Sequence, residues 1–123
     1  MSELMHAVAD DRPYTCPVSA EATAWWMSVG CCVQNLLHAV ALEPESANRV
    51  WQLPVLHRSV TEILEALCDR FGEDRRSLIS FEPESDLERL LGRYPPLETP
   101  EALTAGFVHD GNEHELVKRA LHC

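Results

Sequence analysis

Residues that can do chemistry gather in one stretch, PVSAEATAWWMSVGCCVQNLLHAV, at residues 17–40. Cys31 and Cys32, followed by His38, could bind a metal ion or supply a nucleophile, because thiolates and imidazoles do both. Ser28 could act as a nucleophile or face a ligand, and Trp25 with Trp26 could form the wall of a binding site. The plainest alternative is a loop that caps and packs on the following helix.

The spacing of these residues argues against a metal site and a nucleophile. Neighbouring side chains on a helix point about 100 degrees apart, so Cys31 and Cys32 do not converge on one ion. Neither C-x-x-C, H-E-x-x-H nor a G-x-S-x-G elbow occurs. Ser28 suits the N-cap of the helix. Cys31 lies in its first turn, where the pKa of a thiol can be lowered, but no residue pattern identifies a base. We predict no metal ligands and no catalytic residues.

Composition excludes other classes of function. The 123 residues suit one domain, and 46% hydrophobic with 24% charged residues is typical of globular chains. The net charge of −10 argues against a nucleic-acid partner, which requires clustered Lys and Arg. No apolar run approaches the length of about 18 residues that spans a membrane, and the N-terminus lacks the features of a signal peptide. Five cysteines, an odd number, fit a reducing compartment. We therefore expect a cytoplasmic location and no membrane contact.

The elements that would position the candidate residues are short strands and helices. We predict strands in YTCPV (14–18), RVWQLP (49–54) and LISFEP (78–83). Pro44 should end the helix that follows Ser28 or begin a short turn. The apolar residues of this helix recur at helical spacing, which predicts one buried face: Val29, Val33, Leu36, Leu37 and Val40.

Further helices follow. SVTE at 59–62 is a capping box before an apolar stripe that ends at Gly72. The segments 84–94, 99–107 and 112–121 also read as helices, with Thr99 and Asn112 as caps. This order predicts a small α/β or α+β domain at 13–123, preceded by an N-terminal tail at 1–12.

Four segments, in this order, resemble the C-terminal half of extended short-chain dehydrogenases, the NAD-dependent sugar epimerases and dehydratases. They are CPVSAEATAWWMSVGCCVQNLLHAVAL, VWQLPVLHRSVTEILEALCDRFG, ISFEPESDLERLLGRYPP and ALTAGFVHDGNEHELVKRAL. The positions that match the D-erythronate dehydrogenase branch are Cys16, Pro17, Val18, Trp25, Ser28, Val33, Leu36, Leu37, His38, Ala39, Leu53, Pro54, Val60, Glu62, Gly106, Phe107 and Asp110. The likeness covers nearly all of the chain after about residue 13 and lies in the order and spacing of short motifs.

The chain departs from the pattern of that branch at several positions. Ala22 and Thr23 stand where the pattern has a Thr-Arg pair, and the loss of that Arg removes the natural partner of an anionic substrate group. Gln52 replaces an Asn, Val55 a Gly and Glu101 an Arg. These changes put erythronate-like specificity in question.

The larger departure is the absence of the cofactor-binding part of the family. Full enzymes carry an N-terminal Rossmann domain with a glycine-rich loop and a Y-x-x-x-K pair. Here Val18 and Glu98 lie four residues after the two tyrosines, and G-x-G-x-x-G does not occur. The resemblance therefore implies a C-terminal lobe made of helices and short strands, without the Rossmann sheet. It binds no cofactor itself, whereas NAD or NADP is implied for a full-length relative.

The resemblance implies a function for the loop before the helix. It would line a substrate cleft between two lobes, with Pro17, Val18, Thr23, Trp25 and Ser28 as substrate-binding residues. Side chains alternate along a strand-like segment, so we expect Trp25 to face the cleft and Trp26 to pack in the core. Trp25→Ala should then be nearly neutral for stability. The alternative is that both tryptophans pack inside the lobe.

Three functions remain open. The first is a truncated or degenerate substrate-binding lobe of an NAD-dependent sugar or sugar-acid epimerase or dehydrogenase, inactive alone, with a missing Rossmann domain as partner and a small sugar-like substrate. The second is a protein-interaction or self-association module that uses the exposed inter-lobe surface and forms a homo-oligomer. The third is a small enzyme using Cys31.

Overall fold

The structure is a computed structural model that describes residues 2–42 and 50–121. Its helices are α1 (Ser2–Ala9), α2 (Val29–Ala41), α3 (Val60–Phe71), the 3-10 helix η1 (Glu73–Leu78), α4 (Ser85–Leu91), α5 (Pro100–Thr104) and α6 (Glu113–Ala120). Its strands are β1 (Tyr14–Cys16), β2 (Thr23–Trp26), β3 (Leu56–Ser59) and β4 (Ile79–Phe81). The predicted class, helices with short strands, is confirmed.

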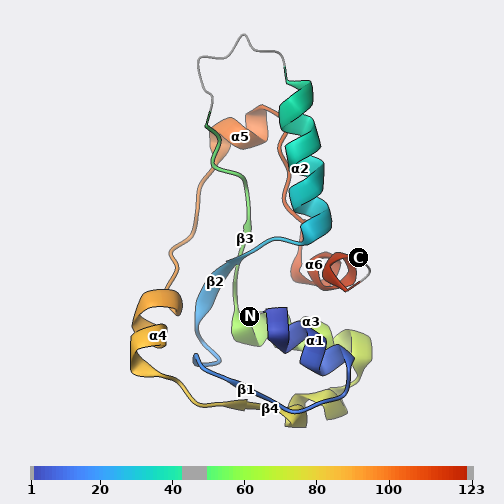
Figure 1. Cartoon of the computed structure of the whole chain (residues 1–123), viewed down its shortest axis with the longest axis vertical. Helices are drawn as coiled ribbons and strands as arrows, with labels where there is room; N and C mark the ends of the chain where they lie inside the picture. Colours follow the sequence, from blue (N-terminus) through green and yellow to red (C-terminus); the bar gives the residue numbers. More distant parts are fainter. Residues whose placement is uncertain (1, 43–49, 122–123) are drawn as a thin grey trace.

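The described strands form two small sheets. β1 pairs with β4 in parallel, and β2 pairs with β3 in antiparallel register from Thr23 opposite Ser59 to Trp26 opposite Leu56. Figure 1 shows α1, α3 and the β1–β4 pair at one end of the molecule, while α2 and α5 extend toward the other. Within the described residues, no helix is long and apolar enough to cross a membrane.

Helix α3 is the centre of the core. Ser59 and Glu62 form the predicted capping box. Gly72 follows the last residue of the helix with a φ of 120°, a backbone conformation that is unfavourable for any residue with a Cβ atom. Its apolar stripe packs between α1 and α6. The buried residues of α3 are Val60, Ile63, Leu64, Ala66, Leu67 and Cys68. The capping residues and the apolar stripe both favour a helix with the same bounds, so α3 forms as predicted.

Leu64→Ala should lower the free energy of unfolding by about 2–5 kcal/mol, because it removes a large side chain from a packed core. Leu64 is only 4% exposed. Chemical denaturation followed by circular dichroism measures the change. Leu90→Ala is the control, since Leu90 on α4 is 65% exposed and its truncation should cost less than about 0.5 kcal/mol. Equal effects of the two substitutions would contradict the central place of α3.

The N-terminal residues differ from the expected tail. Residues 2–9 form α1, and its apolar side chains lie in the core: Leu4, Met5, Ala7 and Val8. Arg75 of η1 donates a hydrogen bond of 2.7 Å to the Val8 carbonyl near the end of this helix. The segment is therefore an integral part of the fold, although it precedes the part of the sequence that carries the family resemblance and was expected to be a tail.

The predicted strand at 49–54 is wrong where the structure describes it. Residues 50–55 belong to no strand, and β3 begins only at Leu56. Val50 is exposed, whereas Pro54 is buried. A strand requires a neighbouring strand that completes its hydrogen-bond ladder. In the described part of the chain, the pairing of β2 with β3 ends at Trp26 opposite Leu56, so residues 50–55 have no partner strand.

The predicted burial of the apolar face of α2 is also wrong. The helix forms as expected, with Ser28 as its N-cap, but its last residue is Ala41, and Pro44 lies outside the described residues. All five apolar residues assigned to the core are exposed: Val29, Val33, Leu36, Leu37 and Val40. Apolar periodicity shows that a helix has a face to cover, but it does not show what covers it.

Candidate functional site

Helix α2 packs on the rest of the chain through its more polar side. Cys31 and Asn35 are its buried residues, and His38 continues this row one turn later. The Asn35 amide bonds both the N–H and the C=O of Val108, at 2.9 and 2.8 Å. His38 Nε2 lies 2.7 Å from the Ala105 carbonyl oxygen, and Gly106 has a φ of 99° where a Cβ would come within 2.7 Å of that ring. The segment 105–108 thus packs against the side of α2 that carries Asn35 and His38.

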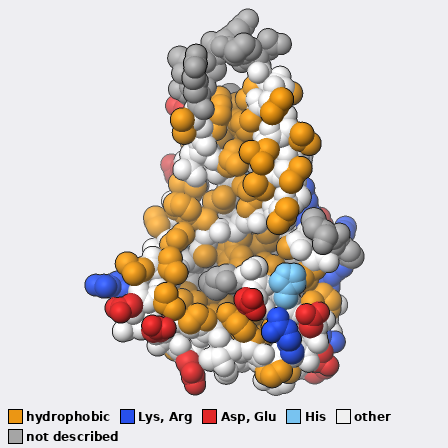
Figure 2. Space-filling view, viewed as in Figure 1, with side chains coloured by type: hydrophobic (Ala, Val, Ile, Leu, Met, Phe, Trp, Pro, Cys, Tyr) orange, Lys and Arg blue, Asp and Glu red, His pale blue; other side chains and the backbone are white. Residues whose placement is uncertain are grey.

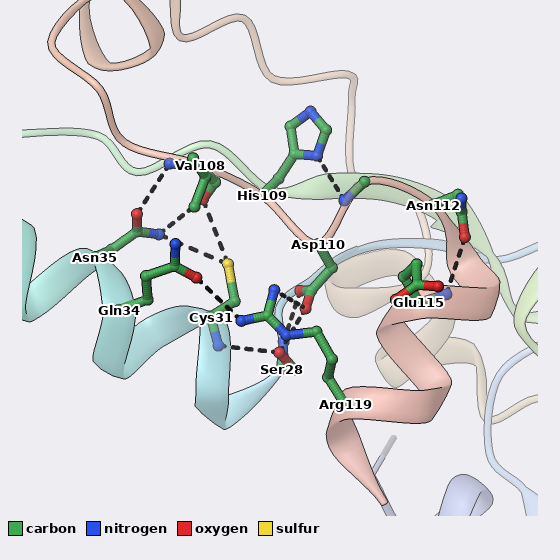
Figure 3. Close-up of polar contacts among 11 residues, drawn as sticks. Ser28, Cys31, Gln34, Asn35, Val108, His109, Asp110, Asn112, Glu115 and Arg119 are labelled. Carbon is green, nitrogen blue, oxygen red and sulfur yellow. Dashed lines mark hydrogen bonds and ion pairs between the residues drawn. The ribbon is translucent and has the colours of Figure 1, made fainter. Parts of the chain in front are cut away.

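Asp110 joins three parts of the fold (Figure 3). Its carboxylate accepts hydrogen bonds from the Ser28 amide and hydroxyl, at 2.9 and 2.5 Å. Arg119 of α6 lies 3.4 Å from the same carboxylate, whose side chain is fully buried. The Ser28 hydroxyl also accepts from the Cys31 amide at 3.1 Å, which caps α2. Every described part of this cluster is satisfied within the chain, so its role is to hold α2 against α6.

Cys31 has the wrong surroundings for a nucleophile. Its thiol is buried and donates to the Val108 carbonyl at 3.4 Å. Burial, and next the negative charge of Asp110, raise the pKa of the Cys31 thiol. A raised pKa keeps the thiol protonated, whereas a nucleophile requires the thiolate. This geometry argues against an enzyme that uses Cys31.

The two tryptophans on β2 face opposite sides, as predicted. Trp26 is 6% exposed, belongs to the core and donates to the Arg58 carbonyl at 3.0 Å. Trp25 is 37% exposed. Its indole N–H donates to the Pro95 carbonyl at 2.7 Å, and its ring meets Tyr94 edge-on with centroids 5.0 Å apart. Trp25 therefore offers a partly exposed indole held in one orientation.

A cavity of about 260 Å³ lies beside these tryptophans. It opens to solvent between α1, the segment 25–29 and α6, and most of its wall is apolar or aromatic. The lining residues are Ser2, Met5, His6, Trp25, Trp26, Met27, Ser28, Val29, Leu116, Ala120 and Leu121. Small-molecule sites commonly combine such a wall with a few polar groups. Among these residues, His6 and Ser2 supply polar groups from α1.

The structure brings only some of the predicted site residues together. Trp25 and Ser28 line the same cavity, although Ser28 is buried and its hydroxyl serves Asp110 and the helix cap. Pro17 and Val18 line a separate small depression with side chains of β1 and α4. Thr23 donates from Oγ1 to the Tyr94 carbonyl at 2.9 Å. A shared substrate contact of all five residues therefore stays a prediction.

Sequence reasoning missed the contribution of α1 and α6 to this cavity. Met5 and His6 come from the segment that was expected to be a tail, and Leu116 and Leu121 come from the C-terminal helix. The apolar spacing of Leu4, Met5 and Val8 could have indicated a packed helix. No local pattern could have placed α6 beside Trp26, because their proximity depends on the tertiary fold.

Comparison with known proteins gives one curated relative at the level of sequence. No protein-family model matches the chain. The D-erythronate dehydrogenase of Cupriavidus necator is 29% identical over 106 residues, which are 84% of this chain and 33% of that enzyme. The chain therefore spans about a third of the length of the curated relative that it matches.

Solved structures show the same partial match. The nucleoside-diphosphate-sugar epimerase of Agrobacterium tumefaciens superposes with a TM-score of 0.84 at 26% identity, over 93% of this chain and 34% of that one. The GalE-like L-threonine dehydrogenase of Cupriavidus necator, in its holo form, gives 0.77 at 15% identity, over 98% and 40%. At this low identity the second likeness shows the fold alone.

These matches agree with the order of motifs along the chain. The homologous enzyme and the superposed structures each extend well beyond the part that this chain matches. In sequence pattern and in fold, the chain corresponds to the C-terminal lobe of an extended short-chain dehydrogenase of the NAD-dependent epimerase/dehydratase kind.

Proposed function

We propose that the chain is the substrate-binding lobe of an NAD-dependent epimerase or dehydrogenase for a sugar or sugar acid, and that it is inactive without a dinucleotide-binding lobe. The observation that carries this proposal is the cavity beside Trp25, in a chain that superposes on a third of a nucleoside-diphosphate-sugar epimerase. An indole face commonly packs on the C–H groups of a sugar ring. Trp25 has such a face, fixed by its bonds to the segment 94–95.

A chimaera tests the proposed function. The third of the Cupriavidus necator D-erythronate dehydrogenase that matches this chain would be replaced by residues 1–123. We expect NAD-dependent oxidation of D-erythronate or of another sugar acid, followed by absorbance of the reduced cofactor. Trp25→Ala should lower kcat/KM by at least about tenfold, the equivalent of one lost contact of about 1.4 kcal/mol. Leu90→Ala is the control and should leave kcat/KM within about twofold. A folded chimaera inactive toward sugar acids and nucleotide sugars would contradict the proposal.

The isolated chain should bind no NAD(H) or NADP(H). A pyrophosphate is held by a helix N-terminus behind a glycine-rich turn that lets the backbone approach closely. Here the glycines are scattered, with Gly72, Gly106 and Gly111 each in a separate turn, and the single lysine, Lys118, lies on α6. Calorimetry and fluorescence of the reduced cofactor measure binding, with an intact dehydrogenase as positive control. Micromolar affinity would show that this prediction is wrong.

A second candidate function is an interaction module. The observation that favours it is the apolar face of α2, which no described part of the chain covers. Contiguous apolar surface of this kind is typical of protein–protein contacts. This function needs neither a cofactor nor the cavity beside Trp25, so a chimaera without activity would leave it standing.

A further inference from the structure

One face of the β2–β3 pair carries three side chains that can donate hydrogen bonds. Thr23 and Trp25 lie two residues apart on β2, so their side chains leave the strand on the same side. His57 on β3 is directly opposite Trp25 in the register, and directly opposite residues of an antiparallel pair share a face. A hydroxyl, an indole and an imidazole therefore stand in one row.

The segment that follows α4 runs beside β2 for a short distance only. The Thr23 amide donates to the Gly92 carbonyl at 2.9 Å, and the Tyr94 amide donates to the Thr23 carbonyl at 3.4 Å. Pro95 and Pro96 come next and have no amide hydrogen, so they cannot continue a strand ladder. Beyond this point, side chains of β2 and β3 are needed to bind the carbonyl groups of Tyr94 and Pro95.

The three donors bind these two carbonyl groups. Thr23 Oγ1 donates to the Tyr94 carbonyl at 2.9 Å, and His57 Nε2 lies 2.5 Å from the same oxygen. Because a carbonyl oxygen can only accept, the His57 ring carries a hydrogen on Nε2. The Trp25 indole N–H donates to the Pro95 carbonyl at 2.7 Å. Thr23, His57 and Trp25 thus hold the same two residues.

The orientation of the Trp25 indole depends on the segment 94–95. Trp25 is 37% exposed and lines the cavity, so only part of its ring is packed. Figure 2 shows the surface over β2 and β3 covered mostly by hydrophobic side chains, with charged ones concentrated nearer α4 and the β1–β4 pair. The indole is oriented by its hydrogen bond and by its edge-on contact with the Tyr94 ring, and both partners belong to this segment.

We propose that His57 is a positioning residue of the sugar site. With Thr23 it holds the Tyr94 carbonyl, and the segment held in this way orients the Trp25 indole beside the cavity. His57 is not among the described residues that line the cavity, so it acts through Trp25 and not on the substrate. The inference rests on the proposed function, because it adds a residue to the same site.

Two substitutions of His57 separate its hydrogen bond from its bulk. Glutamine keeps an N–H donor near the place of Nε2, whereas leucine has no donor. In the purified chain, NMR of 15N-labelled protein follows the indole N–H of Trp25, which is assigned by its loss in Trp25→Phe. His57→Leu should speed the exchange of this hydrogen with solvent by about tenfold, the equivalent of about 1.4 kcal/mol. His57→Gln should leave the exchange rate within about threefold of the original.

A matched control distinguishes this local effect from a general loosening of the fold. His114→Leu also removes an imidazole that bonds a side chain, Asp69, at 3.0 Å, but this pair lies between α3 and α6. It should leave the Trp25 signal unchanged. The indole N–H of Trp26, which is bound to the Arg58 carbonyl, should exchange at the same rate in all variants.

The chimaera provides the functional measurement. With D-erythronate as substrate, His57→Leu should raise KM by about fivefold or more and change kcat by less than about twofold, because a less ordered indole weakens ground-state and transition-state binding alike. His57→Gln should restore most of the original KM, and His114→Leu should change neither parameter.

Two results would overturn the role of His57. One is an unchanged exchange rate of the Trp25 indole N–H in His57→Leu. The other is an active chimaera in which His57→Leu leaves KM unchanged while Trp25→Ala lowers kcat/KM. An inactive chimaera counts against the proposed function, whereas the exchange measurement needs no substrate and still decides whether His57 positions Trp25.

Discussion

Asp110→Ala should lower the free energy of unfolding by about 2 kcal/mol or more, because it leaves buried hydrogen-bond donors without their acceptor, at about 1–3 kcal/mol each. The Asp110 carboxylate is fully buried and receives the Ser28 amide, the Ser28 hydroxyl and Arg119. Without it, the buried Ser28 groups lose their acceptor. The cap of α2 and its attachment to α6 would weaken together, because the same serine takes part in both.

Urea denaturation followed by circular dichroism measures this change. Asp86→Ala is the control, because Asp86 forms an exposed pair with Arg89 on α4 and should contribute less than about 1 kcal/mol. Asp110→Asn keeps the shape of the side chain and removes its charge, so its effect should lie between those of the other two variants. A loss below about 1 kcal/mol for Asp110→Ala would show that α2 is held mainly by its other contacts.

Trp26→Ala should lower the free energy of unfolding by about 3–5 kcal/mol, because it leaves a large cavity in the core. The Arg58 carbonyl would also lose the indole N–H that it accepts. Trp25→Ala should lower the free energy of unfolding by less than Trp26→Ala does. It loses one hydrogen bond to Pro95, of about 1 kcal/mol, and an edge-on contact with Tyr94, of about 0.5–1.5 kcal/mol. The near-neutral effect expected from the sequence therefore becomes a loss of about 1.5–2.5 kcal/mol.

Thermal and chemical denaturation of both variants measure this difference, and acrylamide quenching of the remaining tryptophans reports their exposure. In Trp25→Ala, the remaining indole fluorescence should become less accessible to quencher, whereas Trp26→Ala should have the opposite effect. Equal destabilisation by the two substitutions would show that both indoles support the core alike. The reading of Trp25 as the wall of a substrate cleft would then lose its basis.

The sequence alone was sufficient for features that depend on neighbouring residues. The caps at Ser28, Ser59 and Asn112 each accept the amide hydrogen bond that their residue types predicted. Helix α3 formed with the stripe and the end that were expected, because the caps, the apolar period and Gly72 act over a single helix. The opposite faces of Trp25 and Trp26 followed from the alternation of side chains along a strand. Local rules also located the loop on which part of the candidate site lies.

Tertiary structure alone decided which surfaces meet. Ser28 and Asp110 are 82 residues apart, so no local pattern could have shown that the predicted cleft serine serves a buried carboxylate. The cavity beside Trp25 needs α1 and α6. The apolar spacing of α2 correctly predicted a helix, but the burial of its apolar face was wrong. Burial depends on a partner surface, which the spacing of residues in one helix does not encode. The segment 50–55 has the composition of a strand but forms none, because a strand exists only where a neighbouring chain segment completes its hydrogen bonds.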